Sequence, residues 1–154
     1  MIFAHNGTLD QLSPPRRWRP EGETDSETLF CLLLEWMEDE GVSFSDFSLI
    51  ENWLREYNER GTMNLLFSDG QTLFAYRDRC GYNGLCFTYR EAPFPKVKLK
   101  DEDWEVDLTE DKRPSEKGFV IATRALTTEQ WDELREGCLF VVKGGEAVYG
   151  DPRA

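Results

Sequence analysis

The chain has 154 residues, the size of one ordinary domain, and 40 % of its residues are hydrophobic. Thirty acidic against eighteen basic residues give a net charge of −12, which argues against the basic surface that nucleic-acid binding requires. No apolar run approaches the length of a membrane-spanning helix, so we expect neither nucleic acid nor membrane as a partner.

The first expected element is an apolar strand, Met1-Ile2-Phe3-Ala4, which leads directly into His5-Asn6-Gly7. Asn-Gly is a common turn. A second interpretation is functional: the side-chain amide of Asn6 and the backbone N–H of Gly7, which no side chain covers, can together hold an oxyanion. His5 is the single histidine, and at a strand end it is either structural or catalytic.

Residues 10–22 contain three prolines and show little periodicity, which predicts a loop. This loop carries the one basic cluster of the chain, Arg16-Arg17-Trp18-Arg19. Because the cluster is short and flanked by prolines, we interpret it as a solvated loop and not as a phosphate site.

Two helices are expected after the loop. The first begins at Thr24, which stands three residues before Glu27 in the spacing of a capping box, and it ends at Gly41. Its apolar residues recur at spacings of three and four, which is typical of a helix packed against a core. The second helix is expected over about 45–60 and is closed by Gly61.

Asp25 falls in the first turn of the first predicted helix. An acidic residue there is favoured by the helix dipole, and one interpretation is a helix cap. The other interpretation is a carboxylate that pairs with the ammonium group of a substrate.

The remaining chain predicts mostly antiparallel strands, which makes the layout α+β. The sequence Ser68-Asp69-Gly70 predicts the turn of a hairpin, and Trp104, Val106 and Leu108 alternate as in an edge strand. Thr127 is expected to begin a short helical turn through Leu134. The expected strands are 63–67, 72–76, 85–89 and 119–123, followed by a closing hairpin of 138–142 and 146–149.

The chain has four cysteines and no close Cys-x-x-Cys pair. With only one histidine, this pattern argues against a zinc site. We interpret the residues as free, buried thiols of a protein in the reducing cytoplasm. They are Cys31, Cys80, Cys86 and Cys138.

Several motifs occur in a fixed order along the chain: FAHNGTL at 3–9, GETDSE at 22–27, NLLFSDG at 64–70, LFAYRD at 73–78 and IATRALTTEQW at 121–131. In this order the chain resembles the class II glutamine amidotransferases, in particular their stand-alone group. The resemblance implies an N-terminal-nucleophile hydrolase with a four-layer αββα fold, here incomplete at the N-terminus, that uses no cofactor or metal.

The resemblance also assigns roles to single residues. His5-Asn6-Gly7 matches the His-Asn-Gly of the family, so Asn6 and Gly7 would form the oxyanion hole, with Gly7 also contacting the substrate. Asp25 matches the acidic residue that binds the α-ammonium of glutamine, or of a related amino acid. His5 and Thr24 are further candidates beside these residues. An enzyme of this family would split glutamine to glutamate and ammonia.

The chain departs from the family at the nucleophile, which in the family is an N-terminal cysteine whose own α-amine acts as the base. Here residue 1 is methionine, and we assign no nucleophile to this chain. We therefore expect residues 1–154 to be the C-terminal portion of the domain and to be inactive alone. Two alternatives stay open: a non-catalytic binding or regulatory protein, and one subunit of a two-chain amidohydrolase. We expect self-association, or tight binding of an N-terminal half.

Overall fold

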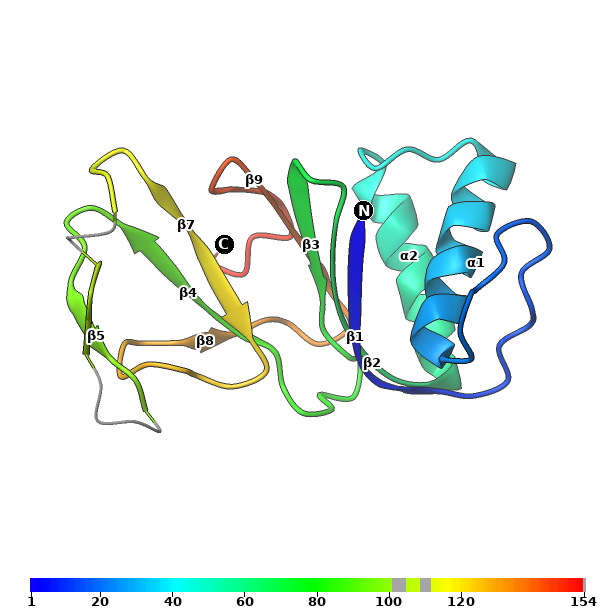
Figure 1. Ribbon diagram of the computed structural model, residues 1–154, viewed down its shortest axis with the longest axis horizontal. Helices are drawn as coiled ribbons and strands as arrows, with labels where there is room; N and C mark the ends of the chain where they lie inside the picture. The colour runs from blue at the N-terminus through cyan, green and yellow to red at the C-terminus, as the bar shows by residue number, and fades with distance from the viewer. Residues whose placement is uncertain (101–104, 109–111, 154) are drawn as a thin grey trace.

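The computed structural model describes residues 1–100, 105–108 and 112–153. It confirms an α+β protein with antiparallel sheets (Figure 1). The elements, in chain order, are β1 (Ile2–Leu9), α1 (Asp25–Glu40), α2 (Phe47–Tyr57), the 3-10 helix η1 (Asn58–Arg60), β2 (Gly61–Ser68), β3 (Thr72–Tyr76), β4 (Cys86–Glu91), β5 (Lys96–Lys98), β6 (Glu105–Asp107), β7 (Lys117–Ala122), β8 (Asp132–Glu133), β9 (Leu139–Lys143) and β10 (Glu146–Tyr149).

The strands form a five-stranded sheet in the order β1-β2-β3-β9-β10, a three-stranded sheet in the order β7-β4-β8, and the separate pair β5-β6. Helices α1 and α2 cover one face of the five-stranded sheet, and the three-stranded sheet lies on its other face (Figure 1). The described residues thus build three successive layers, one of helices and two of strands. None of the helices in this part of the chain is long and apolar enough to cross a membrane.

Alternation along the central strands explains the layers, because successive side chains of a strand point to opposite faces. Phe74 and Tyr76 of β3 pack toward the helices, whereas Ala75 packs toward the second sheet. The Phe67 and Phe74 rings stack with their centroids 4.6 Å apart in the helix-facing core. The other strand residues of that core include Leu65, Leu139 and Val141, and those facing the second sheet include Leu66, Phe140 and Val142.

Both predicted helices are confirmed. Helix α1 is preceded by Thr24, whose hydroxyl accepts the Glu27 N–H at 3.2 Å, and it ends at Gly41 in the left-handed conformation. The predicted capping box is only half formed: the Glu27 carboxylate accepts N–H groups from Glu21 and Gly22 instead of reaching back to Thr24. The side chain of Glu27 thereby holds the preceding loop against the start of the helix.

The helical turn predicted from Thr127 to Leu134 is wrong. Thr127 forms an isolated bridge with Leu99, and residues Asp132–Glu133 form β8 beside β4. Local side chains compete with the helix: the Thr127 hydroxyl accepts the indole N–H of Trp131 at 3.0 Å. The Leu134 N–H donates to the Leu85 carbonyl, so the backbone of this segment is satisfied by strand partners.

The edge strand predicted from alternation is present as β6, which contains Val106. Leu108 follows it and is buried, whereas Trp104 lies outside the described residues. The other predicted strands and both hairpins are confirmed, and Gly70 in the β2–β3 turn has a φ of 95° as Asp-Gly predicts.

The basic cluster is exposed, as predicted for a solvated loop, and hydrogen bonds hold its backbone against α1. The buried carboxylate of Glu35 accepts the N–H groups of Arg16 and Arg17 at 2.7 and 2.9 Å, and the Arg16 Nε–H at 2.8 Å. Asp39, one turn later, pairs with both guanidinium groups. Intramolecular carboxylates therefore neutralise these arginines.

Candidate functional site

Asn6 and Gly7 lie inside strand β1 and do not form a turn. Asn6 is paired with Asn64 of β2, and Gly7 is paired with Met63. The turn interpretation of Asn-Gly is therefore wrong. Both residues are held at fixed register in the first strand of the five-stranded sheet, which is the kind of rigid element that positions functional groups well.

The backbone N–H of Gly7 points to the open edge of β1. Asp10 donates its N–H to the carbonyl of Arg60, the residue directly before β2. In an antiparallel pair, hydrogen-bonded and non-hydrogen-bonded residues alternate along each strand. Even-numbered residues of β1 therefore bond to β2, and the N–H groups of the odd-numbered residues His5, Gly7 and Leu9 point away from it. The order of the sheet places no strand on that side among the described residues.

Glycine is required at position 7. Its φ is 155°, and a Cβ at this position would lie 2.0 Å from the carbonyl oxygen of Thr62 on β2. Real Cβ atoms do not approach backbone oxygen so closely, and a positive φ is also unfavourable for other residues. The close approach of β1 to β2 at this point therefore depends on the missing side chain.

The side chain of Asn6 is exposed and lies on the face of β1 opposite to the helices. Its neighbour His5 contacts α1, so the alternation of a strand turns Asn6 to the other face. There, a small cavity of about 110 Å³ is lined by Asn6, Asn64, Leu85 and Thr123, among others. The Asn6 Oδ1 accepts a hydrogen bond from Asn83 Nδ2 at 3.2 Å.

Asp25 joins the start of α1 to the open edge of β1. Its Oδ2 accepts the N–H of Leu9 at 2.7 Å, and its Oδ1 accepts the N–H of Ser26 at 2.8 Å. The N-cap hydrogen bond of the helix is made by Thr24, and Asp25 also accepts the N–H of Ser26 in the first turn. The Asp25 side chain keeps 27 % of its surface exposed.

His5 is a buried link between β1, β2 and α1. Its Nε2 lies 3.1 Å from the Thr62 carbonyl oxygen, which can only accept, so Nε2 carries a proton. In the neutral ring, Nδ1 then accepts from the Ser26 hydroxyl at 3.0 Å, and it lies 3.8 Å from Asp25 Oδ2. The side chain has no exposed surface, so the geometry favours the structural interpretation of His5.

The sequence-predicted residues fall into two groups. Gly7 N–H and the Asp25 carboxylate, which is held at the Leu9 N–H, lie along the open edge of β1, and the Asn6 side chain lies on the face of the strand opposite to the helices. Thr24 caps α1, and His5 hydrogen-bonds Ser26 of α1 and the Thr62 carbonyl of β2. These two residues therefore stabilise the elements that carry the other candidates. Ser26, Asn64 and Asn83 were not among the predicted site residues. Ser26 and Asn64 lie inside the motifs GETDSE and NLLFSDG, and Asn83 lies in the glycine-flanked turn Gly81-Tyr82-Asn83-Gly84.

The four cysteines differ in exposure. Cys31 and Cys86 are buried as predicted, whereas Cys80 is exposed and Cys138 is half-buried. Burial raises the pKa of the Cys31 and Cys86 thiols. A nucleophilic cysteine needs the opposite shift, so neither buried thiol is suited to attack a carboxamide.

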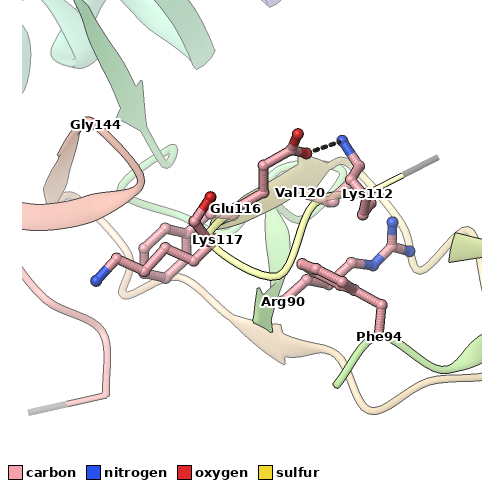
Figure 2. Close-up of a pocket in the computed structure, with 10 residues that line it drawn as sticks. Arg90, Phe94, Lys112, Glu116, Lys117, Val120 and Gly144 are labelled. Atoms are coloured by element: carbon pink, nitrogen blue, oxygen red, sulfur yellow. Dashed lines mark ion pairs between the residues drawn. The ribbon is translucent and has the colours of Figure 1, made fainter. Parts of the chain in front are cut away.

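A larger hollow of about 430 Å³ lies at β4, β7 and the β9–β10 turn (Figure 2). Its cations are already paired: Lys112 with Glu116 at 3.4 Å, Arg90 with Glu129 at 2.6 Å, and Lys117 with Glu146. None of the sequence-predicted site residues lines it. This hollow is therefore separate from the site at β1.

The family model of the class II glutamine amidotransferases matches residues 1–152. Similar proteins include the "Uncharacterized protein MJ1515" of Methanocaldococcus jannaschii, 41 % identical over 99 % of this chain and 44 % of that protein. The "Putative glutamine amidotransferase YafJ" of Escherichia coli is 36 % identical over 88 % of this chain and 54 % of its own length. The chain thus spans about half the length of these curated relatives.

Two solved structures are similar in fold. The "predicted glutamine amidotransferase" of Pseudomonas aeruginosa has a TM-score of 0.75 and 34 % identity, over 95 % of this chain and 58 % of that chain. A class-II domain protein of Silicibacter pomeroyi has a TM-score of 0.54 and 22 % identity, over 95 % of this chain and 65 % of that chain, which shows likeness of fold alone. The family match and these relatives show that the chain belongs to the class II glutamine amidotransferases.

Proposed function

We propose that residues 1–154 are the C-terminal part of a glutaminase domain and that they bind glutamine along the open edge of β1. Gly7 N–H and the Asn6 amide stabilise the oxyanion, and Asp25 pairs with the α-ammonium. The observation that carries the proposal is that the Asp25 carboxylate, held at the Leu9 N–H, and the Gly7 N–H lie along the same open edge of β1.

The spacing of these groups suits one amino acid. Asp25 is held at the N–H of Leu9, two residues along β1 from Gly7. Two residues of a strand span about 7 Å, which is the scale of one extended amino acid. A ligand in this position would place its carboxamide oxygen at Gly7 and its ammonium at Asp25.

Asp25 can serve its own chain and a ligand together. An ionised carboxylate has about four acceptor sites, and two are used by the N–H groups of Leu9 and Ser26. The exposed part of the side chain leaves room for a charge-assisted bond to an ammonium, which is stronger than a neutral hydrogen bond.

The proposed chemistry is acyl transfer. A thiolate attacks the carboxamide carbon, a C–S bond forms, and the carbonyl electron pair moves to oxygen. Ammonia leaves when that pair returns and the leaving nitrogen is protonated, and water then hydrolyses the thioester to glutamate and regenerates the thiol. Removing one donor of an oxyanion hole typically costs about 10²–10³ in rate. This chain contributes the binding and oxyanion groups, and we assign no nucleophile to it.

Nuclear magnetic resonance of the 15N-labelled chain tests the proposal without turnover. We expect L-glutamine to shift the backbone amide of Gly7 and the side-chain amide of Asn6. Glutaramate, which is glutamine without its α-ammonium, should bind at least tenfold more weakly. Equal binding of the two ligands, or shifts confined to the hollow around Arg90, would contradict the proposed site.

A further inference from the structure

Asn83 lies beside Asn6 although the two residues are far apart in the sequence. Asn83 Nδ2 donates to Asn6 Oδ1 at 3.2 Å. Asn83 has a φ of 52°, between Gly81 at 73° and Gly84 at 70°. Asparagine is one of the few residues other than glycine that adopt this conformation at low cost, so the loop can place an amide here.

The loop that carries Asn83 is anchored by Asp78, which is only 1 % exposed. Asp78 Oδ1 accepts the N–H groups of Cys80 and Tyr82 at 2.8 and 3.2 Å. Its Oδ2 accepts from Asn58 Nδ2 and from the Met63 N–H, both at 2.8 Å. Burial opposes ionisation, but these four donors hold the pKa of Asp78 below its usual value. A buried, satisfied carboxylate of this kind makes the loop rigid.

Asn64 ties the same loop to the strand beside Asn6. Its Nδ2 donates to the Tyr82 carbonyl at 2.6 Å, and its Oδ1 accepts the Asp78 N–H at 2.9 Å. Asn64 is the direct cross-strand partner of Asn6. The position of Asn83 relative to Asn6 is thus fixed from β2 and not only from within the loop.

The contact with Asn83 determines which end of the Asn6 amide is available. Because Asn6 Oδ1 already accepts a hydrogen bond, its Nδ2 is left as the donor, and it has no protein partner in the part of the chain that the structure describes. Rotating the Asn6 amide by half a turn, with Asn83 kept in its observed orientation, would bring two NH₂ groups face to face. Only the observed orientation presents a donor to an oxyanion.

We propose that Asn83 is a positioning residue that orients the Asn6 amide so that its NH₂ group faces the developing oxyanion. The use of this orientation, to stabilise an oxyanion, rests on the proposed function. The orientation itself is measurable without substrate. It assigns a role in recognition to the part of the β3–β4 loop that follows the LFAYRD motif at 73–78.

Two substitutions at position 83 separate orientation from loop structure. Asn83→Gly keeps the left-handed backbone and removes the amide. Asn83→Asp offers Asn6 an acceptor in place of a donor, so the Asn6 amide should turn and donate its NH₂ group to the new carboxylate. Loss of a contact and reversal of a contact therefore give different signals at Asn6.

The experiment uses the 15N-labelled chain, with the Asn6 side-chain resonances assigned by their disappearance in Asn6→Ala. In Asn83→Asp we expect one Asn6 Nδ2 proton to move downfield, and this shift should vanish when the pH falls below about 3.9, where an ordinary aspartate is protonated. In Asn83→Gly the order parameter of the Asn6 amide should fall. Melting temperatures identify any variant whose loop has unfolded.

Glutamine titrations separate the two proposals. We expect both variants at position 83 to weaken glutamine binding at least tenfold, and to have no further effect when combined with Asn6→Ala, because neighbouring residues that act through one another are not additive. If the Asn6 amide is unchanged in both folded variants, the positioning role is overturned. If the Asn6 signals change as expected but glutamine binds to none of the proteins, the proposed function fails and the orientation by Asn83 stands.

Discussion

At the residue scale, the hydrogen bonds of Asp25 distinguish its role in stabilising the fold from its proposed role in binding an ammonium group. The carboxylate holds the Leu9 N–H and the Ser26 N–H, and His5 lies behind it. The first two contacts use one acceptor oxygen each, and an asparagine keeps one of these oxygens, whereas an ammonium ligand needs the negative charge. A substitution that removes the charge and keeps an acceptor therefore tests the binding role.

We expect Asp25→Asn to cost about 0.5–1.5 kcal/mol of unfolding free energy, the typical value of one hydrogen bond. Binding of L-glutamine should fall at least tenfold, because the charge that pairs with the ammonium is lost. Urea unfolding and an NMR titration measure the two effects. A sharp fall in stability with unchanged glutamine affinity would make Asp25 a purely structural residue.

Gly7→Ala should destabilise the chain through two effects, a strained φ and a Cβ placed against the Thr62 carbonyl. Together we expect a loss of about 3 kcal/mol or more. Gly70→Ala is the matched control, because Gly70 also has a positive φ but open space around its Cα. The control should lose only about 1–2 kcal/mol. Similar losses in chemical unfolding of the two variants would show that β1 can move away from β2.

At the element scale, Glu35 couples the proline-rich loop to helix α1 in a pH-dependent way. Hydrogen bonds from Arg17 and Arg16 lower its pKa to about 2 from the ordinary 4.5. A carboxyl group whose pKa is lowered by folding stabilises the folded state above its unfolded pKa. This contribution is therefore complete above about pH 4.5 and is lost as the pH falls toward 2.

We expect Glu35→Gln to lower stability at pH 7 and to flatten the acid limb of the stability profile between pH 4.5 and 2. Glu38→Gln is the control, since Glu38 is exposed on the same helix. Urea unfolding at a series of pH values compares the two variants. An acid limb of unchanged slope in Glu35→Gln would show that other carboxylates produce the acid sensitivity.

The elements with strong local signals were predictable from the sequence. Helix α1 has its cap at Thr24, its apolar spacing and Gly41 at its end, and the β2–β3 hairpin has Asp69-Gly70 in its turn. The helix prediction after Thr127 is wrong because capping-box spacing is only a local signal. The backbone of this segment pairs instead with distant partners, β4 and Leu99. Pairing between distant strands leaves no mark at a single position.

The site was predictable in part. The motif resemblance selected Asn6, Gly7 and Asp25, and the structure adds where each group points. The contact of Asn83 with Asn6 spans 77 positions, and the register of β1 with β2 decides which N–H groups reach the open edge. Both depend on tertiary packing, which the local sequence does not encode.

At the scale of the whole molecule, we predict that the chain alone releases no ammonia from glutamine. The reason is chemical: we assign it no activated nucleophile, and burial raises the pKa of two of its thiols. A coupled glutamate dehydrogenase assay on the purified chain measures release. Turnover that is lost in Asn6→Ala and survives substitution of every cysteine would contradict the thiol-based mechanism.

Among the described residues, β1 is an edge strand of the five-stranded sheet and β7 is an edge strand of the three-stranded sheet, so each has a neighbouring strand on one side only. At the start of β1, Ile2 is 75 % exposed beside Met1 at 51 %. Unpaired edges with apolar side chains favour pairing with another chain. The net charge of −12 opposes association at low salt, and this repulsion is screened as salt rises.

We therefore expect the chain to self-associate through its strand edges as concentration and salt increase, or to bind tightly a segment that completes the β1 edge. Light scattering coupled to size exclusion measures the mass at several concentrations. Ile2→Lys should reduce association, because a charged residue on an edge strand opposes pairing. Leu49→Lys is the control, since Leu49 is 48 % exposed on α2 and belongs to neither edge strand. A chain that remains monomeric at high concentration and high salt, and that binds no hydrophobic dye, would show that the β1 edge is not an association surface.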